Sequence, residues 1–121
     1  MVCGHKGSGM ITVDGLPSAI RVGPYDIKIV FLPDDSDDYG HFLASELELG
    51  IQRQFASGAV AVDTFLHEIL HAVWWAAALP RKRCEEERAV SQIAPSLTQV
   101  FRDHPELLTW MQKTLAANTK P

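Results

Sequence analysis

Two histidines four residues apart, inside a long apolar stretch, constrain the fold of this chain more than any other feature. The stretch runs from Val60 to Leu79 and contains His67, Glu68 and His71 in the segment HEILH. In a helix, side chains at positions i and i+4 lie on the same face, so both imidazoles can point toward one metal ion. Because the residues around them are apolar on nearly every side, the sequence predicts a helix that is buried.

Ser57 and Pro80 mark the expected ends of this helix. A serine hydroxyl can accept a backbone N–H of the first turn, and a proline cannot continue a helix. Two histidines and a glutamate buried in such a helix each need a polar partner, and a metal ion with its water supplies one for all three. We therefore prefer a metal site to a core in which the histidines bond only to backbone carbonyls.

The order of residues in HEILH matches the HExxH pattern, in which two histidines bind Zn²⁺ on one helix face. Glu68 lies beside the histidines, so its carboxylate would contact a water on the metal, as a general base in hydrolysis must. Asp63, one turn before His67, could hydrogen-bond to the ligand or simply belong to the helix start. The motif therefore predicts a zinc-dependent hydrolase with His67 and His71 as ligands and Glu68 as catalyst.

A catalytic zinc ion usually has three protein ligands and keeps one position for water. The acidic triplet at 85–87 opens the next predicted helix, which must fold back against the first across a short connection. Glu86 and Glu87 both stand at helical spacing from its apolar face, so either could reach the metal. Asp103 or His104 could do so only if the far end of that helix came to the site, and we favour a glutamate.

The first half of the chain is expected to form a small sheet. Alternating and β-branched residues predict strands at 20–22 and 27–32, and one or two more between 39 and 52. The segment DDSDD at 34–38 lacks the glycine and the final glutamate that a calcium-binding EF-hand loop requires. It is predicted to be a solvated hairpin loop.

The second half is expected to be helical. Apolar residues at helical spacing predict helices over 85–102 and 106–116, and Pro95 should kink the first of these or interrupt its first turn. The first nine residues are small, polar and rich in glycine, which is typical of a flexible tail. The 121 residues therefore predict a tail over 1–9 and one α+β domain over 10–121.

Composition limits the partners and the compartment. A net charge of −4 and a pI near 5.6 argue against a nucleic-acid-binding surface. The longest apolar segment is interrupted by charged and polar residues, and no signal peptide precedes it, so we expect neither a membrane span nor secretion. Cys3 and Cys84 have no metal-binding or disulfide spacing, which fits a reducing cytoplasm. The oligomeric state is not predicted.

The sequence from Ala61 to Leu108 resembles small phage and prophage zinc-peptidase-like proteins related to the ImmA/IrrE and SprT-like families. TFLHEILHAV and SQIAPSLTQVFRDHPEL carry the resemblance, together with Glu87 three residues before Val90. It implies a minimal zincin-like fold, in which a small sheet packs on the HExxH helix and two further helices follow. It also implies His67, His71 and Glu87 as zinc ligands.

The expected activity is hydrolysis of a peptide bond in a peptide or protein substrate, through a metal-activated water with Glu68 as general base. Tyr39, His41 and His104 are the side chains considered as donors to the oxyanion. The alternative is a non-catalytic zinc-containing module that binds another protein. A fourth protein ligand from Cys84, Asp103 or His104 would distinguish this alternative, since it would close the site to water.

Overall fold

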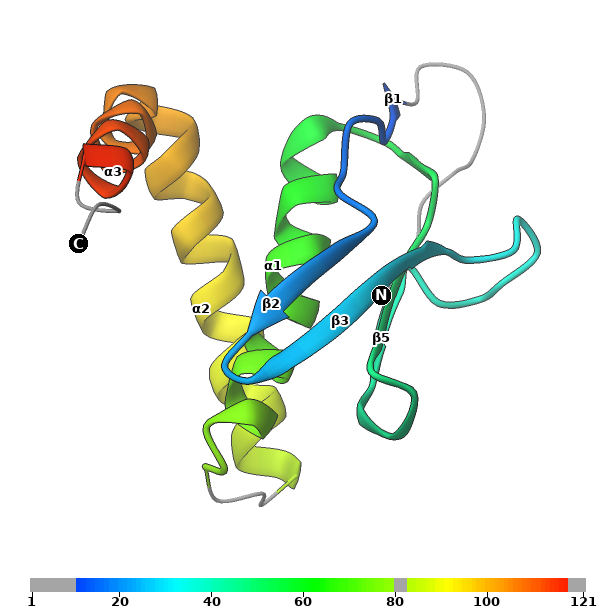
Figure 1. Cartoon of the computed structure of the whole chain (residues 1–121). Helices are drawn as coiled ribbons and strands as arrows, with labels where there is room; N and C mark the ends of the chain where they lie inside the picture. Colours follow the sequence, from blue (N-terminus) through cyan, green and yellow to red (C-terminus); the bar gives the residue numbers. More distant parts are fainter. Residues whose placement is uncertain (1–10, 80–82, 118–121) are drawn as a thin grey trace.

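The computed structural model describes residues 11–79 and 83–117, and it confirms the predicted α+β class. Short strands occupy the first half of the chain and three helices the second (Figure 1). The expected tail at 1–9 and the expected helix-ending Pro80 lie outside the described residues.

A four-stranded sheet has the order β2-β3-β5-β4. Its members are β2 (Ala19–Val22), β3 (Tyr25–Phe31), β4 (Gly40–Leu43) and β5 (Glu48–Ile51). The antiparallel hairpin of β2 and β3 turns through Gly23, whose φ of 58° lies in the region that favours glycine. The strands predicted at 20–22 and 27–32 correspond to this hairpin.

The loop at 34–38 is largely exposed, but it does not close a hairpin, so that part of the prediction is wrong. It leads from β3 to β4, and β5 lies between those two strands, parallel to β3 and antiparallel to β4. A 3-10 turn, η1 (Ala44–Glu46), separates β4 from β5. Leu49, Gly50 and Ile51 of β5 are all buried, and this explains why β5 lies inside the sheet, between β3 and β4.

A second, two-stranded sheet pairs β1 (Ile11–Thr12) with β6 (Gln54–Phe55). Neither strand was predicted, because two residues are too few to show an alternating pattern. Phe55 is fully buried and packs with Ile51 and Ala61, so this small sheet closes one end of the core.

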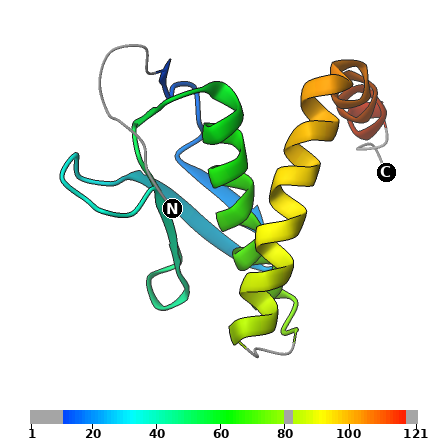
Figure 2. The same cartoon turned by 180° about the vertical axis from the view of Figure 1, so that it is seen from behind.

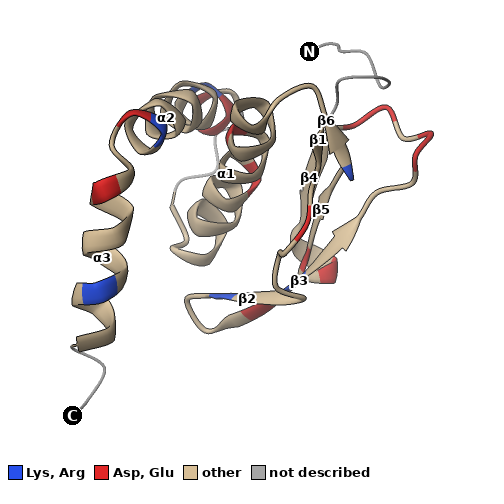
Figure 3. Cartoon of the chain, turned by 90° about the horizontal axis from the view of Figure 1, so that it is seen from above, with Lys and Arg blue, Asp and Glu red and all other residues tan. Residues whose placement is uncertain are grey.

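Helix α1 (Gly58–Ala76) covers one face of the four-stranded sheet. It begins where the sequence predicts, since the Ser57 hydroxyl accepts the backbone N–H of Val60 at 3.2 Å. Ala72 of α1 packs on Ile27 and Leu49 of the sheet to form the centre of the core. Figure 3 shows α1 between the sheet and α2, so that three layers follow one another.

The expectation that α1 is buried all round is wrong. Val60, Val62 and Val73 are 41%, 45% and 42% exposed. The helix contacts the sheet on one side and α2 on another, which leaves a third side without a neighbour among the described residues.

Helix α2 (Arg83–Asp103) runs back along α1, and α3 (Pro105–Ala117) contacts α2 beyond the turn at His104 (Figure 2). Both helices agree with the predicted ranges to within two residues. Pro95 lies inside α2 without ending it, so the predicted interruption does not occur. None of the described helices has the length and apolar character needed to cross a membrane.

Candidate metal centre

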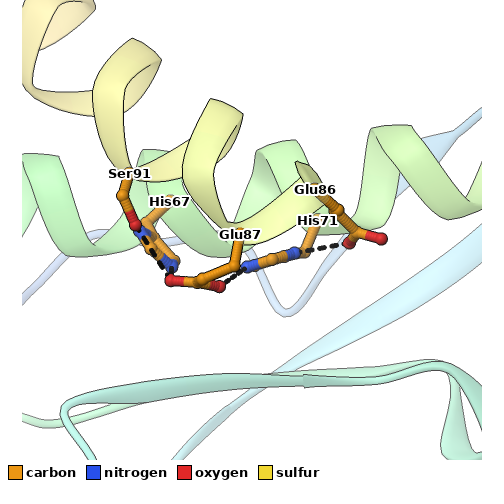
Figure 4. A network of polar contacts seen from close by, with 5 residues as sticks. All are labelled: His67, His71, Glu86, Glu87 and Ser91. Carbon is orange, nitrogen blue, oxygen red and sulfur yellow. Dashed lines mark hydrogen bonds and ion pairs between the residues drawn. The ribbon is translucent and has the colours of Figure 1, made fainter. Parts of the chain in front are cut away.

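The imidazole rings of His67 and His71 lie side by side on α1, with their centroids 4.9 Å apart. Both rings face the first turns of α2, where Glu87 points back toward them (Figure 4). The spacing of four residues produces this arrangement, because it repeats close to one helical turn. The antiparallel return of α2 adds the carboxylate.

Glu87 reaches both histidines. Its Oε2 lies 3.3 Å from Nε2 of His67, and its Oε1 lies 2.9 Å from Nε2 of His71. Ser91, one turn further along α2, donates its hydroxyl to Oε2 of Glu87 at 2.9 Å. His67, His71 and Glu87 form the only group of three or more potential metal ligands that converges within the described residues, with the three donor atoms within 4.8 Å of one another.

His71 has a carboxylate oxygen at each ring nitrogen. Its Nδ1 lies 2.6 Å from Oε2 of Glu86, while its Nε2 faces Glu87. A neutral imidazole has one N–H and one lone pair, so it can donate to only one of the two carboxylates. If Nδ1 donates to Glu86, the lone pair of Nε2 faces an anionic oxygen, and a cation between them would stabilise both.

The protonation states of these groups also suit a metal cation. Burial lowers the pKa of His67, which favours the neutral imidazole with a lone pair to offer. Burial alone would raise the pKa of Glu87, but the hydrogen bond from Ser91 and the neighbouring imidazoles outweigh it and hold that pKa below its ordinary value. A neutral imidazole and an ionised carboxylate are the forms that bind metals.

The donor set fits zinc in particular. Two imidazole nitrogens and one carboxylate oxygen are a ligand set of catalytic zinc sites, and tetrahedral bonds of about 2.0–2.2 Å separate ligand atoms by about 3.3–3.6 Å. The 3.3 Å between His67 and Glu87 lies in this range, and the 2.9 Å between His71 and Glu87 is slightly below it.

Glu68 lies next to this group but does not join it. It is only 9% exposed, and among the described residues its carboxylate has no hydrogen bond or ion pair. Burial raises the pKa of Glu68 to about 7. A cation held by the neighbouring histidines would favour the ionised carboxylate, so Glu68 could then accept a proton near neutral pH.

Strand β4 approaches Glu68 closely because Gly40 has no side chain. A Cβ atom at Gly40 would lie 3.0 Å from Cγ of Glu68 and 3.2 Å from Cγ2 of Thr64. Glycine therefore lets the strand pack directly against the side chain of Glu68.

Two cavities meet at Glu68. One of ≈ 380 Å³ has an aromatic wall of Phe42 and Trp75 beside the two histidines, and Glu86 and Glu87 of α2 also line it. The other, of ≈ 420 Å³, extends toward the start of α1 and the loop before β4. Both cavities share His67, Glu68 and Glu87, so the candidate ligands and catalyst lie where the two meet.

The alternative ligands lie elsewhere. Asp103 accepts hydrogen bonds from Gln99 at 2.8 Å and from Arg102 at 3.3 Å, at the far end of α2. His104 lies 3.4 Å from Glu106 of the following helix. Neither they nor Cys84 belong to the converging group of described residues.

The three residues considered for the oxyanion are not equivalent. Tyr39 lines the larger cavity together with Glu68. His41 contacts Glu48 at 3.0 Å and lines neither of these cavities, because alternate residues of β4 point to opposite faces of the sheet. Of Tyr39, His41 and His104, the geometry therefore favours Tyr39 as the oxyanion donor.

Asp63 was considered as a hydrogen-bond partner of the ligand His67. It lines the larger cavity but has no hydrogen bond to His67.

Two contacts were not foreseen from the sequence. Glu86 was considered only as a replacement ligand, whereas it contacts the opposite nitrogen of His71 from Glu87. Ser91 was given no role, although its place four residues after Glu87 puts the two on one helix face and would have indicated their contact.

A scan against protein-family models and searches of curated proteins and of solved structures find no match to this chain.

Proposed function

We propose that this chain is a zinc-dependent endopeptidase in which His67, His71 and Glu87 hold the metal and Glu68 is the general base. One observation carries the proposal: three donors converge, no fourth described residue joins them, and a buried carboxylate lies beside them. Structural zinc sites are closed by four protein ligands, whereas catalytic sites keep one position open. The arrangement therefore favours catalysis over the non-catalytic module.

A zinc ion at this position would supply a Lewis acid that polarises the scissile carbonyl and lowers the pKa of water toward neutrality. Glu68 would accept a proton from the attacking water and return it to the leaving amine. Oε2 of Glu86 lies 2.6 Å from Nδ1 of His71, and in the tautomer with the proton on Nδ1 it would accept that proton, leave Nε2 as the ligand atom and fix the ring.

The sheet supports a peptide as the substrate. Strand β4 forms an edge of the four-stranded sheet, with β5 as its only partner among the described strands, and its Gly40 and Phe42 line the two cavities. An exposed strand edge can pair with an extended peptide through main-chain hydrogen bonds. A peptide in that position would pass Glu68.

The replacement Glu68→Gln tests this proposal, because glutamine keeps the size of the side chain but cannot accept the proton. Zinc content and thermal stability should stay near those of the wild type, while hydrolysis falls by at least about a hundredfold. The substrate would come from unbiased peptide libraries read by mass spectrometry, with and without a chelator. Asp35→Asn, which changes an exposed loop carboxylate outside both cavities, is the control.

If the zinc-loaded wild type cleaves nothing in such libraries, or if Glu68→Gln cleaves as fast as the wild type, the peptidase proposal fails. The first result would leave the protein-binding zinc module in its place. We also propose a cytoplasmic location, where an exposed free thiol such as that of Cys84 stays reduced.

A further inference from the structure

The larger cavity beside Glu68 has an acidic wall. Asp37 and Asp38 come from the loop before β4 and Asp63 from α1, and no lysine or arginine lines the cavity with them. Figure 3 shows the acidic residues of this loop at the edge of the molecule, beyond the ends of the strands. The three carboxylates have no ion pair among the described residues. The wall that these aspartates form is therefore negatively charged, with no lysine or arginine among the described residues that line the cavity.

Hydrogen bonds from Gln52 hold the backbone of the acidic loop. Gln52 is 3% exposed, and its side-chain amide donates to the backbone oxygen of Asp38 at 2.7 Å and to that of Ser36 at 3.3 Å. The backbone N–H of Gln52 also donates to the oxygen of Tyr39 at 2.8 Å. These bonds fix the loop backbone, so the aspartates are positioned before any ligand arrives.

A second metal ion, beside the zinc proposed at His67, His71 and Glu87, is not the expected ligand of the three aspartates. Asp37, Asp38 and Asp63 do not converge as the His67 group does, since no second group of three ligands comes together among the described residues. Carboxylates that are spread along a wall suit a cationic group on a long flexible side chain, such as that of lysine or arginine, because its charge can reach more than one of them.

Glu68 supplies an independent reason to expect a ligand here. Glu68 is 9% exposed and lacks a hydrogen-bond partner among the described residues. It lines this cavity. No fully buried side-chain oxygen among the described residues lacks a partner, so the unbonded carboxylate oxygens of Glu68 reach the cavity surface, where water or a ligand can bond to them. The aspartates lie on one side of Glu68, and the aromatic wall of Phe42 and Trp75 lies on the other.

We propose that this acidic cavity binds the lysine or arginine side chain of a substrate residue next to the scissile bond. The inference rests on the proposed peptidase function and names its substrate class. A peptide that crosses Glu68 has one neighbouring side chain in the acidic cavity and another against the aromatic wall. The aspartates then select a basic residue on their side.

The test compares binding and cleavage of alanine-based hexapeptides in which lysine, norleucine or aspartate occupies each position in turn. Binding is measured by chemical-shift changes on the zinc-loaded, ¹⁵N-labelled Glu68→Gln protein, and cleavage on the wild type. Lysine should be preferred over norleucine by about tenfold, as two partly exposed charge pairs allow, and salt should weaken the preference. Shifts should centre on residues of the acidic cavity.

Asp37→Asn combined with Asp38→Asn should reduce the lysine preference to less than about threefold, whereas Asp35→Asn should retain it. Asp35 is a matched control, because it belongs to the same exposed loop but does not line the cavity. Asp63→Asn on α1 provides a second variant outside the loop and should also lower the preference. Circular dichroism would verify that each variant is folded.

The possible results separate this inference from the peptidase proposal. Cleavage without a basic preference, or an equal loss from Asp35→Asn and the Asp37 and Asp38 pair, overturns the inference and leaves the peptidase in place. Lysine binding that depends on the cavity aspartates, without cleavage by the wild type, supports recognition of a basic side chain and overturns the peptidase.

Discussion

The two ends of α2 carry similar residues but have different surroundings. Glu86 and Glu87 at its start contact His71 of α1. At its other end, Asp103 contacts Gln99 of α2 itself, and His104 contacts Glu106 at the start of α3. Sixteen residues of helix separate Glu87 from Asp103, or about 24 Å. Residue type alone would allow either end to complete a metal site, so position relative to α1 decides.

The antiparallel pairing of α1 and α2 explains the difference. The short connection after α1 places the start of α2 beside the second half of α1, where His71 lies. The end of α2 lies beside the first turns of α1, since Gln99 and Arg102 line a small cavity together with Ala59 and Val60. A ligand set assembled from two helices therefore forms only at the end where both helices contribute donors.

Removing a histidine should have the largest effect. His71→Ala or His67→Ala should abolish stoichiometric zinc binding, and His71→Ala should also lower thermal stability because the half-buried Glu86 loses its partner. Elemental analysis and thermal unfolding measure the two effects. One zinc per chain retained in either variant would place the metal elsewhere.

Glu87→Gln should come next. The amide keeps the size of the side chain but loses the charge, so zinc affinity should fall by about a hundredfold, measured by competition with a chromogenic chelator. Ser91→Ala is a milder companion, because it removes the hydroxyl that orients the carboxylate. Wild-type affinity in Glu87→Gln would remove this residue from the ligand set.

Glu86→Gln should weaken zinc binding by about tenfold, which is less than the effect of Glu87→Gln. Glu86 contacts Nδ1 of His71 at 2.6 Å, so its effect on a metal bound at Nε2 would act through His71. The same competition assay measures the difference. If Glu86→Gln proved the more damaging of the two, the ligand assignment would move by one residue.

Changes at the other end of α2 should have the smallest effect. Asp103→Asn and His104→Ala should leave zinc affinity within about twofold of the wild type, because surface changes remote from the site rarely propagate. The assay is again chelator competition. A loss comparable to that of Glu87→Gln would show that the two ends of α2 are not as different as their geometry indicates.

Much of the fold could be predicted from the sequence because its signals are local. Ser57 marks the start of α1, and helical spacing gives α2 and α3 to within two residues. The strand order was not predicted, because pairing between β3 and β5 joins segments that are not consecutive strands, and the local alternation that indicates a strand does not say which strand it pairs with. The resemblance to phage peptidases stays a prediction.

In the candidate site, too, local features could be predicted from the sequence, whereas features that depend on tertiary packing could not. The spacing of His67 and His71 places them together without knowledge of any other element. Choosing between Glu86 and Glu87 required knowledge of how α2 is rotated about its own axis relative to α1. Side chains of neighbouring helix residues point in directions only about 100° apart. The acidic wall could not be foreseen either, because Asp63 is far in sequence from the loop that it faces across the cavity.

The most direct test of the central claim is anomalous scattering at the zinc edge from crystals of the zinc-loaded protein. We predict one peak about 2.0–2.2 Å from Nε2 of His67, Nε2 of His71 and a carboxylate oxygen of Glu87, with a non-protein ligand at the fourth position. The absence of a peak there, Glu86 in place of Glu87, or a cysteine, aspartate or histidine as fourth ligand would contradict it.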